Sequence, residues 1–126
     1  AVGLGAAVDY LTAIGLPAVA EHEKRLAEYA LDALTTVPGV RVFGPQDVTD
    51  RGATIAFELD GVHPHDVGQI LDAEGVQVRV GHHCARPLCV RFGVPAMTRA
   101  SFYLYTTVAE VDAMVRGLET VRKVFS

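Results

Sequence analysis

The spacing of apolar residues changes along this chain of 126 residues, and the change limits the folds that it can adopt. Towards both ends, apolar side chains recur every three or four positions, which is the period of an amphipathic helix. Short runs rich in β-branched residues interrupt this pattern and predict strands. The expected helices cover 4–14, 17–37, 64–75, 87–92 and 107–126. The expected strands cover 40–43, 53–59, 76–80 and 100–105.

This order of elements predicts a single domain over 1–126. It favours an α+β fold in which helices pack on one face of a small mixed or antiparallel sheet. No internal repeat, low-complexity stretch or linker divides the chain. Thr107 and Glu110 have the spacing of a capping box, and they predict where the last helix begins.

Composition excludes several classes of protein. Half of the residues are apolar, which predicts a folded chain, and the net charge of −4 disfavours a nucleic-acid-binding protein. No apolar run reaches the roughly 18–20 residues of a membrane span, and the segment Ala1–Val8 lacks the basic region that opens a signal peptide. Two cysteines are too few for a disulfide scaffold and fit a reducing compartment. We therefore expect a cytoplasmic protein without nucleic-acid or membrane partners.

A positive region interrupts this acidic chain. Between Gly75 and Ala109 there is no Asp or Glu, although the same segment contains the arginines Arg79, Arg86, Arg91 and Arg99. Such a region is a natural anion site, because a guanidinium group donates two parallel hydrogen bonds to a carboxylate. Arg79 and Arg99 lie on or beside expected strands and are the candidates. Arg86 and Arg91 flank a short helix, where we expect them to point separately into solvent.

The same region contains a candidate nucleophile, Cys84. It follows Gly81, His82 and His83 in a polar loop, and cationic neighbours lower the pKa of a thiol and so favour the reactive thiolate. The alternative is a buried, inert cysteine. Three adjacent donors rarely surround one metal ion, so no metal site is predicted here. Cys89 lies in an apolar helical stretch and is expected in the core.

The loop sequence resembles that of a known family. Residues 79–85 read Arg-Val-Gly-His-His-Cys-Ala, which is similar to the R-x-G-H-H-C-A signature of group II cysteine desulfurases. These enzymes form the SUF-type branch of the class V aminotransferase-like family. The similarity continues through Pro87-Leu88, residues 94–97 and Arg99-Ala100-Ser101, and it covers essentially the whole chain.

The resemblance implies a function and roles for these residues. Family members are homodimeric enzymes of fold type I that depend on pyridoxal phosphate (PLP). They convert L-cysteine to L-alanine and pass the sulfur, carried as a cysteine persulfide, to an acceptor of the SUF type for iron–sulfur cluster assembly. By resemblance, Cys84 carries the persulfide and Arg99 binds the substrate carboxylate. Arg79 is the signature arginine, and His82 and His83 support the loop.

One departure from the family limits this prediction. The cofactor lysine of the family follows a histidine in a large domain, whereas the only lysines here are Lys24 and Lys123, and neither follows a histidine. PLP enzymes hold their cofactor through such a lysine. The resemblance therefore implies a C-terminal small domain without its large PLP-binding domain. We expect that this chain alone binds no PLP and has no desulfurase activity.

The sequence also allows other interpretations. His65, in the segment His63-Pro64-His65-Asp66, is a candidate ligand for the zinc of a partner acceptor, or else part of an ordinary helix cap with exposed rings. The sequence does not separate a cysteine desulfurase from a selenocysteine lyase or from cysteine sulfinate chemistry. A PLP-free module that relays persulfide is a further alternative. A zinc or redox domain that uses Cys84 and Cys89 is the weakest, because the chain has no further thiols.

Overall fold

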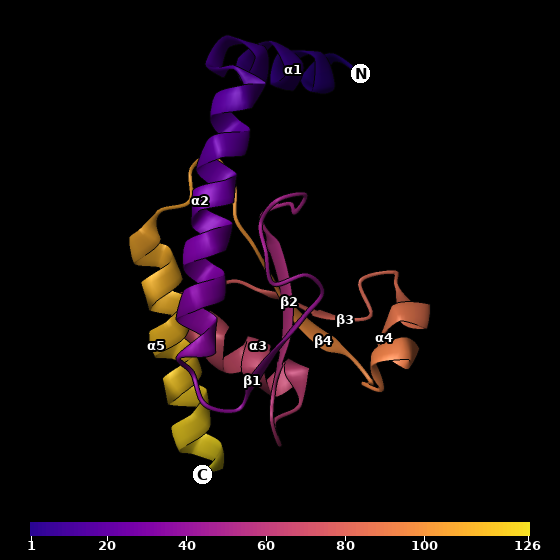
Figure 1. Ribbon diagram of the computed structural model, residues 1–126, viewed down its shortest axis with the longest axis vertical. Helices are drawn as coiled ribbons and strands as arrows, with labels where there is room; N and C mark the ends of the chain where they lie inside the picture. Colours follow the sequence, from indigo (N-terminus) through magenta and orange to yellow (C-terminus); the bar gives the residue numbers. More distant parts are fainter.

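Five helices and a four-stranded antiparallel sheet form the structure, a computed structural model that describes residues 1–126 (Figure 1). The helices are α1 (Val2–Ile14), α2 (Leu16–Thr35), α3 (Pro64–Ala73), α4 (Arg86–Phe92) and α5 (Val108–Phe125). The strands are β1 (Val40–Phe43), β2 (Thr54–Leu59), β3 (Arg79–Gly81) and β4 (Met97–Ser101). Their order in the sheet is β1-β2-β4-β3, and every neighbouring pair is antiparallel. The predicted α+β class is confirmed.

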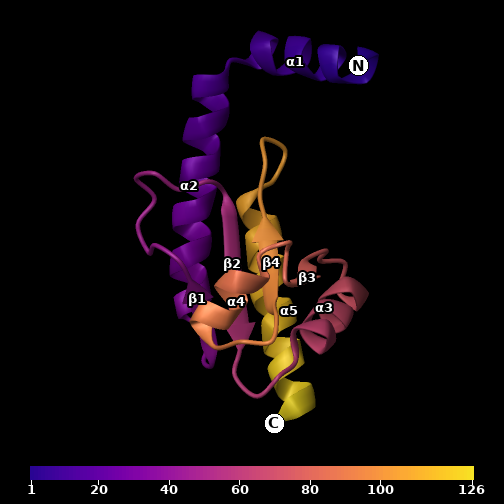
Figure 2. The same cartoon turned by 90° about the vertical axis from the view of Figure 1, so that its right-hand side faces the viewer.

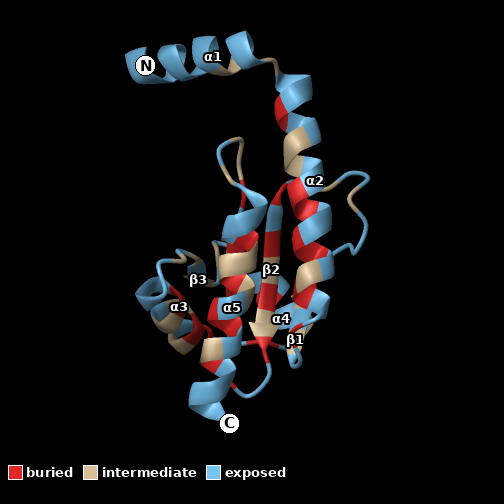
Figure 3. Cartoon of the chain, turned by 90° about the vertical axis from the view of Figure 1, so that its left-hand side faces the viewer, coloured by how far each residue is buried: buried red, intermediate tan, exposed pale blue.

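Three helices cover one face of the sheet. Side chains alternate between the faces of a strand, so Ile55, Phe57 and Leu59 of β2 enter one core, whereas Ala56 and Glu58 face the other side. Buried residues of α2, α3 and α5 complete this main core (Figure 3). The short helix α4 lies on the opposite face (Figure 2). We call the two sides of the sheet the helix face and the open face.

Two glycines allow α3 to approach its neighbours closely. A Cβ atom on Gly117 of α5 would lie 2.6 Å from Leu71 Cδ2, and one on Gly68 of α3 would lie 2.8 Å from Val80 Cγ1. Both distances are shorter than side-chain contacts allow, so neither position accepts a larger residue without movement. Gly68 therefore helps to set the position of β3, which leads into the Cys84 loop.

The expected strands over 76–80 and 100–105 differ from those observed. β3 includes only Arg79–Gly81, and β4 begins at Met97, three residues earlier than expected. The apolar and aromatic residues after Ser101 form a turn instead, in which Thr106 N donates to Tyr103 O (2.9 Å) and Tyr103 N donates to Thr106 Oγ1 (3.0 Å). Strand propensity is local, whereas the observed pairing depends on which residues meet across the sheet.

The capping box predicted at Thr107 is confirmed. Thr107 N donates a hydrogen bond to Glu110 Oε2 over 2.7 Å, and the Thr107 side chain accepts from the third backbone amide of α5. These contacts satisfy amides that would otherwise lack partners at the start of the helix.

Helix α1 has no buried residue and extends away from the other elements beyond one end of α2 (Figures 1 and 3). Its helical period was predicted correctly, but the period alone does not say what covers the apolar residues. The exposed large apolar residues in and just after α1 are Val2, Leu4, Val8, Tyr10, Ile14 and Leu16. No helix is by itself long and apolar enough to cross a membrane; α1 and α2 meet that test only as a pair bent by 81°.

Candidate active site around Cys84

The open face brings the two candidate arginines together. Arg79 of β3 and Arg99 of β4 are directly opposite each other in the antiparallel register. Thr98 and Ala100, on either side of Arg99, are buried in the helix-face core, so Arg99 projects from the open face. Like charges directly opposite each other destabilise a sheet. An anion bound between them would remove this repulsion.

Neither arginine has an acidic partner in this chain. The only ion pair joins Arg41 Nε and Glu58 Oε1 over 2.7 Å. These two residues lie opposite each other on β1 and β2, on the same face of the sheet as Arg99. Arg99 is half-buried, and its buried Nε has no hydrogen-bond partner. A buried donor without an acceptor costs about 1–3 kcal/mol. A ligand carboxylate would supply the missing acceptor.

The loop that carries Cys84 has an unusual backbone. Gly81 has φ 122°, and the two non-glycine residues His83 and Cys84 have φ 53° and 60°. Left-handed conformations cost non-glycine residues about 1–2 kcal/mol each, and such strain is concentrated at functional sites. Ala85 N closes the turn by donating to His82 O over 2.8 Å. The Cys84 side chain is exposed, which contradicts the alternative of a buried, inert thiol.

His83 attaches this loop to the edge of the sheet. Its Nε2 lies 3.1 Å from the Met97 carbonyl oxygen, which only accepts, so Nε2 carries the proton and donates. Nδ1 then has a free lone pair, and it is buried without a partner. Burial lowers the pKa of His83; the charges of Arg99, Arg79 and His82 lower it further, and the Met97 hydrogen bond opposes them. The ring is therefore neutral near pH 7.

The other predicted residues occupy different places. His82 is exposed and contributes its carbonyl to the turn. His65 is exposed in the first turn of α3; its backbone N donates to His63 Nδ1 over 3.2 Å, and no hydrogen bond joins it to the Cys84 loop. Cys89 is 1% exposed in a small cluster with Phe43 and Met97, so its predicted place in the core is confirmed.

Two contributors to the site carry no sequence signal. Met97 acts through its backbone carbonyl, which every residue type has. Gly68 acts by leaving room for Val80, and a glycine within a helical pattern does not by itself indicate a close contact. Only the tertiary contacts, which are the packing of Gly68 against Val80 and the hydrogen bond from His83 to Met97, connect these residues with the Cys84 loop.

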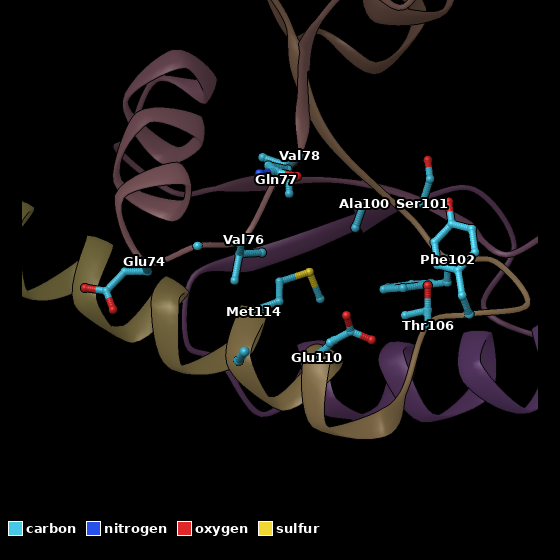
Figure 4. A pocket seen from close by; sticks show the side chains of 13 residues that line it. Glu74, Val76, Gln77, Val78, Ala100, Ser101, Phe102, Thr106, Glu110 and Met114 are labelled. Atoms are coloured by element: carbon cyan, nitrogen blue, oxygen red, sulfur yellow. The ribbon is translucent and has the colours of Figure 1, made fainter.

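The cavity shown in Figure 4 is separate from this site. It has a volume of about 360 Å³ and lies where residues 76–78 diverge from the end of β4, above the start of α5. Glu110 and Met114 line it, and Glu110 is already engaged in the capping box. Neither Cys84 nor the two arginines line this cavity.

The residues of this chain do not by themselves form a PLP or metal site. Lys24 and Lys123 are exposed on α2 and α5, the helices that cover the opposite face of the sheet from Arg99. No lysine is thus available beside Cys84 to hold PLP. No group of three His, Cys, Asp or Glu residues is arranged to hold a metal ion.

Comparison with known proteins gives a consistent family. Residues 1–114 match the model of the aminotransferase class-V family. A probable cysteine desulfurase from Streptomyces coelicolor is 60% identical over 125 residues, which are 99% of this chain and 30% of that protein. A probable cysteine desulfurase from Halalkalibacterium halodurans is 50% identical over the same shares. The chain thus spans about 30% of the length of these relatives.

Solved structures agree with the sequence matches. The apo cysteine desulfurase from Thermococcus onnurineus superposes with a TM-score of 0.91 at 34% identity, over 97% of this chain and 30% of that one. The cysteine desulfurase CsdA from Escherichia coli, in an S-sulfonic acid form, gives a TM-score of 0.86 at 34% identity over the same shares. The fold expected from the resemblance is confirmed.

Proposed function

The chain belongs to the aminotransferase class-V family, and from this premise we propose that it provides the sulfur-carrying site of a PLP-dependent cysteine desulfurase. The observation that carries the proposal is an exposed thiol, Cys84, in a strained loop beside two arginines without acidic partners. An amino-acid substrate needs a cation for its carboxylate, and sulfur abstraction needs an accessible thiolate. The names of the relatives support the same activity.

The proposed reaction transfers one sulfur atom. The Cys84 thiol and L-cysteine become the Cys84 persulfide and L-alanine. The carbon–sulfur bond of the substrate breaks, its electron pair stays on carbon and takes a proton, and a sulfur–sulfur bond forms at Cys84. PLP supplies the electron sink for this chemistry and would be held by residues other than Lys24 and Lys123. The S-sulfonic acid form of the relative from Escherichia coli fits a reactive thiol in this family.

Each residue of the site has a proposed role. Arg99 binds the substrate carboxylate, and its unpaired Nε supports this role. Arg79 contributes the second positive charge. His83 positions the loop through its hydrogen bond to Met97 O, and the exposed His82 supports the turn.

We propose a SUF-type homodimer in the cytoplasm that serves iron–sulfur cluster assembly, and His65 as a contact for its acceptor protein. A selenocysteine lyase uses the same groups and stays an alternative. The absence of a lysine beside Cys84 favours a second candidate, a PLP-free module that relays persulfide.

Substitution of the two cysteines tests the proposal. In the complete protein supplied with PLP and L-cysteine, Cys84→Ser should reduce acceptor-dependent sulfur release to background. The control Cys89→Ala should retain release within about twofold, because Cys89 is buried away from the surface and its loss affects mainly packing. Mass spectrometry should find one added sulfur atom on the Cys84 peptide.

The same assay separates the candidates. If no alanine forms from L-cysteine, but Cys84 gains a sulfur atom when glutathione persulfide is added and glutathione is released, the relay module would replace the desulfurase. Alanine formation by the 126-residue chain alone with PLP would contradict the expected need for further residues. A panel of L-cysteine, L-selenocysteine and cysteine sulfinate identifies the preferred substrate.

A further inference from the structure

Helix α4 presents a distinct surface beside the Cys84 loop. It has 7 residues, and its Cys89 and Phe92 pack towards the sheet. Successive helical residues are about 100° apart, so the residues on the other side of α4 face solvent together. These residues, which we call the α4 surface, are Arg86, Pro87, Val90 and Arg91.

The α4 surface combines free positive charge with an exposed apolar centre. Arg86 and Arg91 are both exposed, and neither forms an ion pair. Val90, between them on the helix surface, is 71% exposed. No Asp or Glu occurs between Gly75 and Ala109, so no acidic residue nearby in the sequence competes for these arginines. Arginine beside an apolar contact is typical of protein interfaces, and unpaired charge attracts a partner of opposite sign.

The thiol and the α4 surface are held in a fixed relation. Cys84 lies two residues before α4, and only Ala85 separates them. The His83–Met97 hydrogen bond fixes the loop on one side, and the buried Cys89 fixes α4 against β1 and β4 on the other. Figure 2 shows α4 in front of the strands, facing away from the other helices. A protein bound to α4 would therefore have Cys84 at its edge.

We propose that the α4 surface docks the protein that accepts sulfur from Cys84, and that this partner is acidic around an apolar contact of its own. The inference rests on the proposed function, because it requires Cys84 to carry persulfide. In the transfer, the thiolate of the partner attacks the outer sulfur of the persulfide. The sulfur–sulfur bond to Cys84 breaks, Cys84 leaves as a thiolate, and the partner becomes the persulfide.

A disulfide-exchange experiment tests the docking independently of PLP. In the complete protein, Cys84 is converted to a mixed disulfide with thionitrobenzoate. The modified protein is then treated separately with two peptides, each of which contains one cysteine and one leucine. Glutamates flank these two residues in the first peptide, and lysines flank them in the second. For each peptide, the rate of thionitrobenzoate release from the protein is divided by the rate of release from the symmetric thionitrobenzoate disulfide. This ratio corrects for the difference in thiol pKa between the two peptides.

The glutamate peptide should react about tenfold faster at low ionic strength and lose this advantage in about 1 M salt. The double variant Arg86→Glu/Arg91→Glu should reverse the preference. The matched control Arg116→Glu/Arg122→Glu changes two exposed arginines of α5 and should retain the preference for the glutamate peptide. Equal corrected rates for both peptides, or an equal change in the control, would overturn the proposal.

A second measurement separates docking from chemistry. With L-cysteine, the Arg86→Glu/Arg91→Glu protein should release sulfide to dithiothreitol at the original rate and transfer less sulfur to the glutamate peptide. A loss of both would place α4 in the reaction itself and refute docking. If the Arg86→Glu/Arg91→Glu protein has a changed oligomeric state in gel filtration, the α4 surface is an interface between copies of the chain, and the docking proposal is refuted too. If the unsubstituted protein releases no sulfide, the proposed function fails, and disulfide exchange alone decides whether the surface recognises acidic partners.

Discussion

The two faces of the same sheet differ in what their side chains can do. On the helix face, β2 and β4 contribute Ile55, Phe57 and Ala100 to a core covered by α2, α3 and α5. On the open face, the same strands contribute Arg99 and Glu58, and the next strand adds Arg79. A strand alternates its side chains, so one segment contributes to the core on one face and to the proposed site on the other. The comparison predicts that substitutions one residue apart affect different properties.

Phe57→Ala should have the largest effect on stability. Phe57 is 0% exposed in the helix-face core, and its truncation should lower the free energy of unfolding by about 3–5 kcal/mol. Urea unfolding measures the change. Phe125→Ala, at the half-exposed end of α5, is the control and should change it by about 0.5 kcal/mol or less. Similar losses in both variants would mean that the helix face does not dominate stability.

Arg99→Gln should affect the substrate rather than the fold. Loss of a charge-assisted bond to a carboxylate costs about 1.5–3 kcal/mol, so kcat/KM for L-cysteine in the complete protein should fall by about 10–100-fold. Arg122→Gln on α5 is the matched control and should leave kcat/KM unchanged. A loss of stability comparable to that of Phe57→Ala would show that the open face is structural as well.

Thr98→Val should increase stability. Thr98 is the only buried polar residue of the helix face, and its Oγ1 has no hydrogen-bond partner. Removal of this hydroxyl should raise the free energy of unfolding by about 1 kcal/mol. Thr107→Val should instead lower the free energy of unfolding. The Thr107 Oγ1 donates to Glu110 Oε2 over 2.9 Å, and the loss of this hydroxyl should cost about 1 kcal/mol. Destabilisation by Thr98→Val would mean that its hydroxyl makes a bond in solution.

His83 should give the smallest effect, a dependence of stability on pH. The folded protein holds the pKa of His83 below its ordinary value of 6.5, so the unfolded chain binds the extra proton first as pH falls. The contribution of His83 is therefore complete above about pH 6.5 and is lost as pH falls below it towards the lowered pKa. NMR titration of the ring measures this pKa. Arg99→Gln should raise it, and an unchanged value would show that the two residues do not interact.

The sequence predicted the helices better than the strands. The periods of α2, α3 and α5 and the capping box at Thr107 are local signals, and each was confirmed. The short strands were displaced, because residues 76–78 have strand-like composition but do not pair with β4. The motif around Cys84 identified a candidate nucleophile, but nothing in it predicts two consecutive left-handed residues at His83 and Cys84.

The sequence by itself determined the element types, the family resemblance and the positive segment that contains Cys84. These properties depend on residue types at short spacing, which a linear chain already contains. Only the tertiary structure decided that Arg79 lies opposite Arg99, that His83 reaches the carbonyl of Met97, and that Val90 is exposed between two arginines. The register of the strands and the packing of α4 decide these contacts, and both depend on residues far apart in the chain.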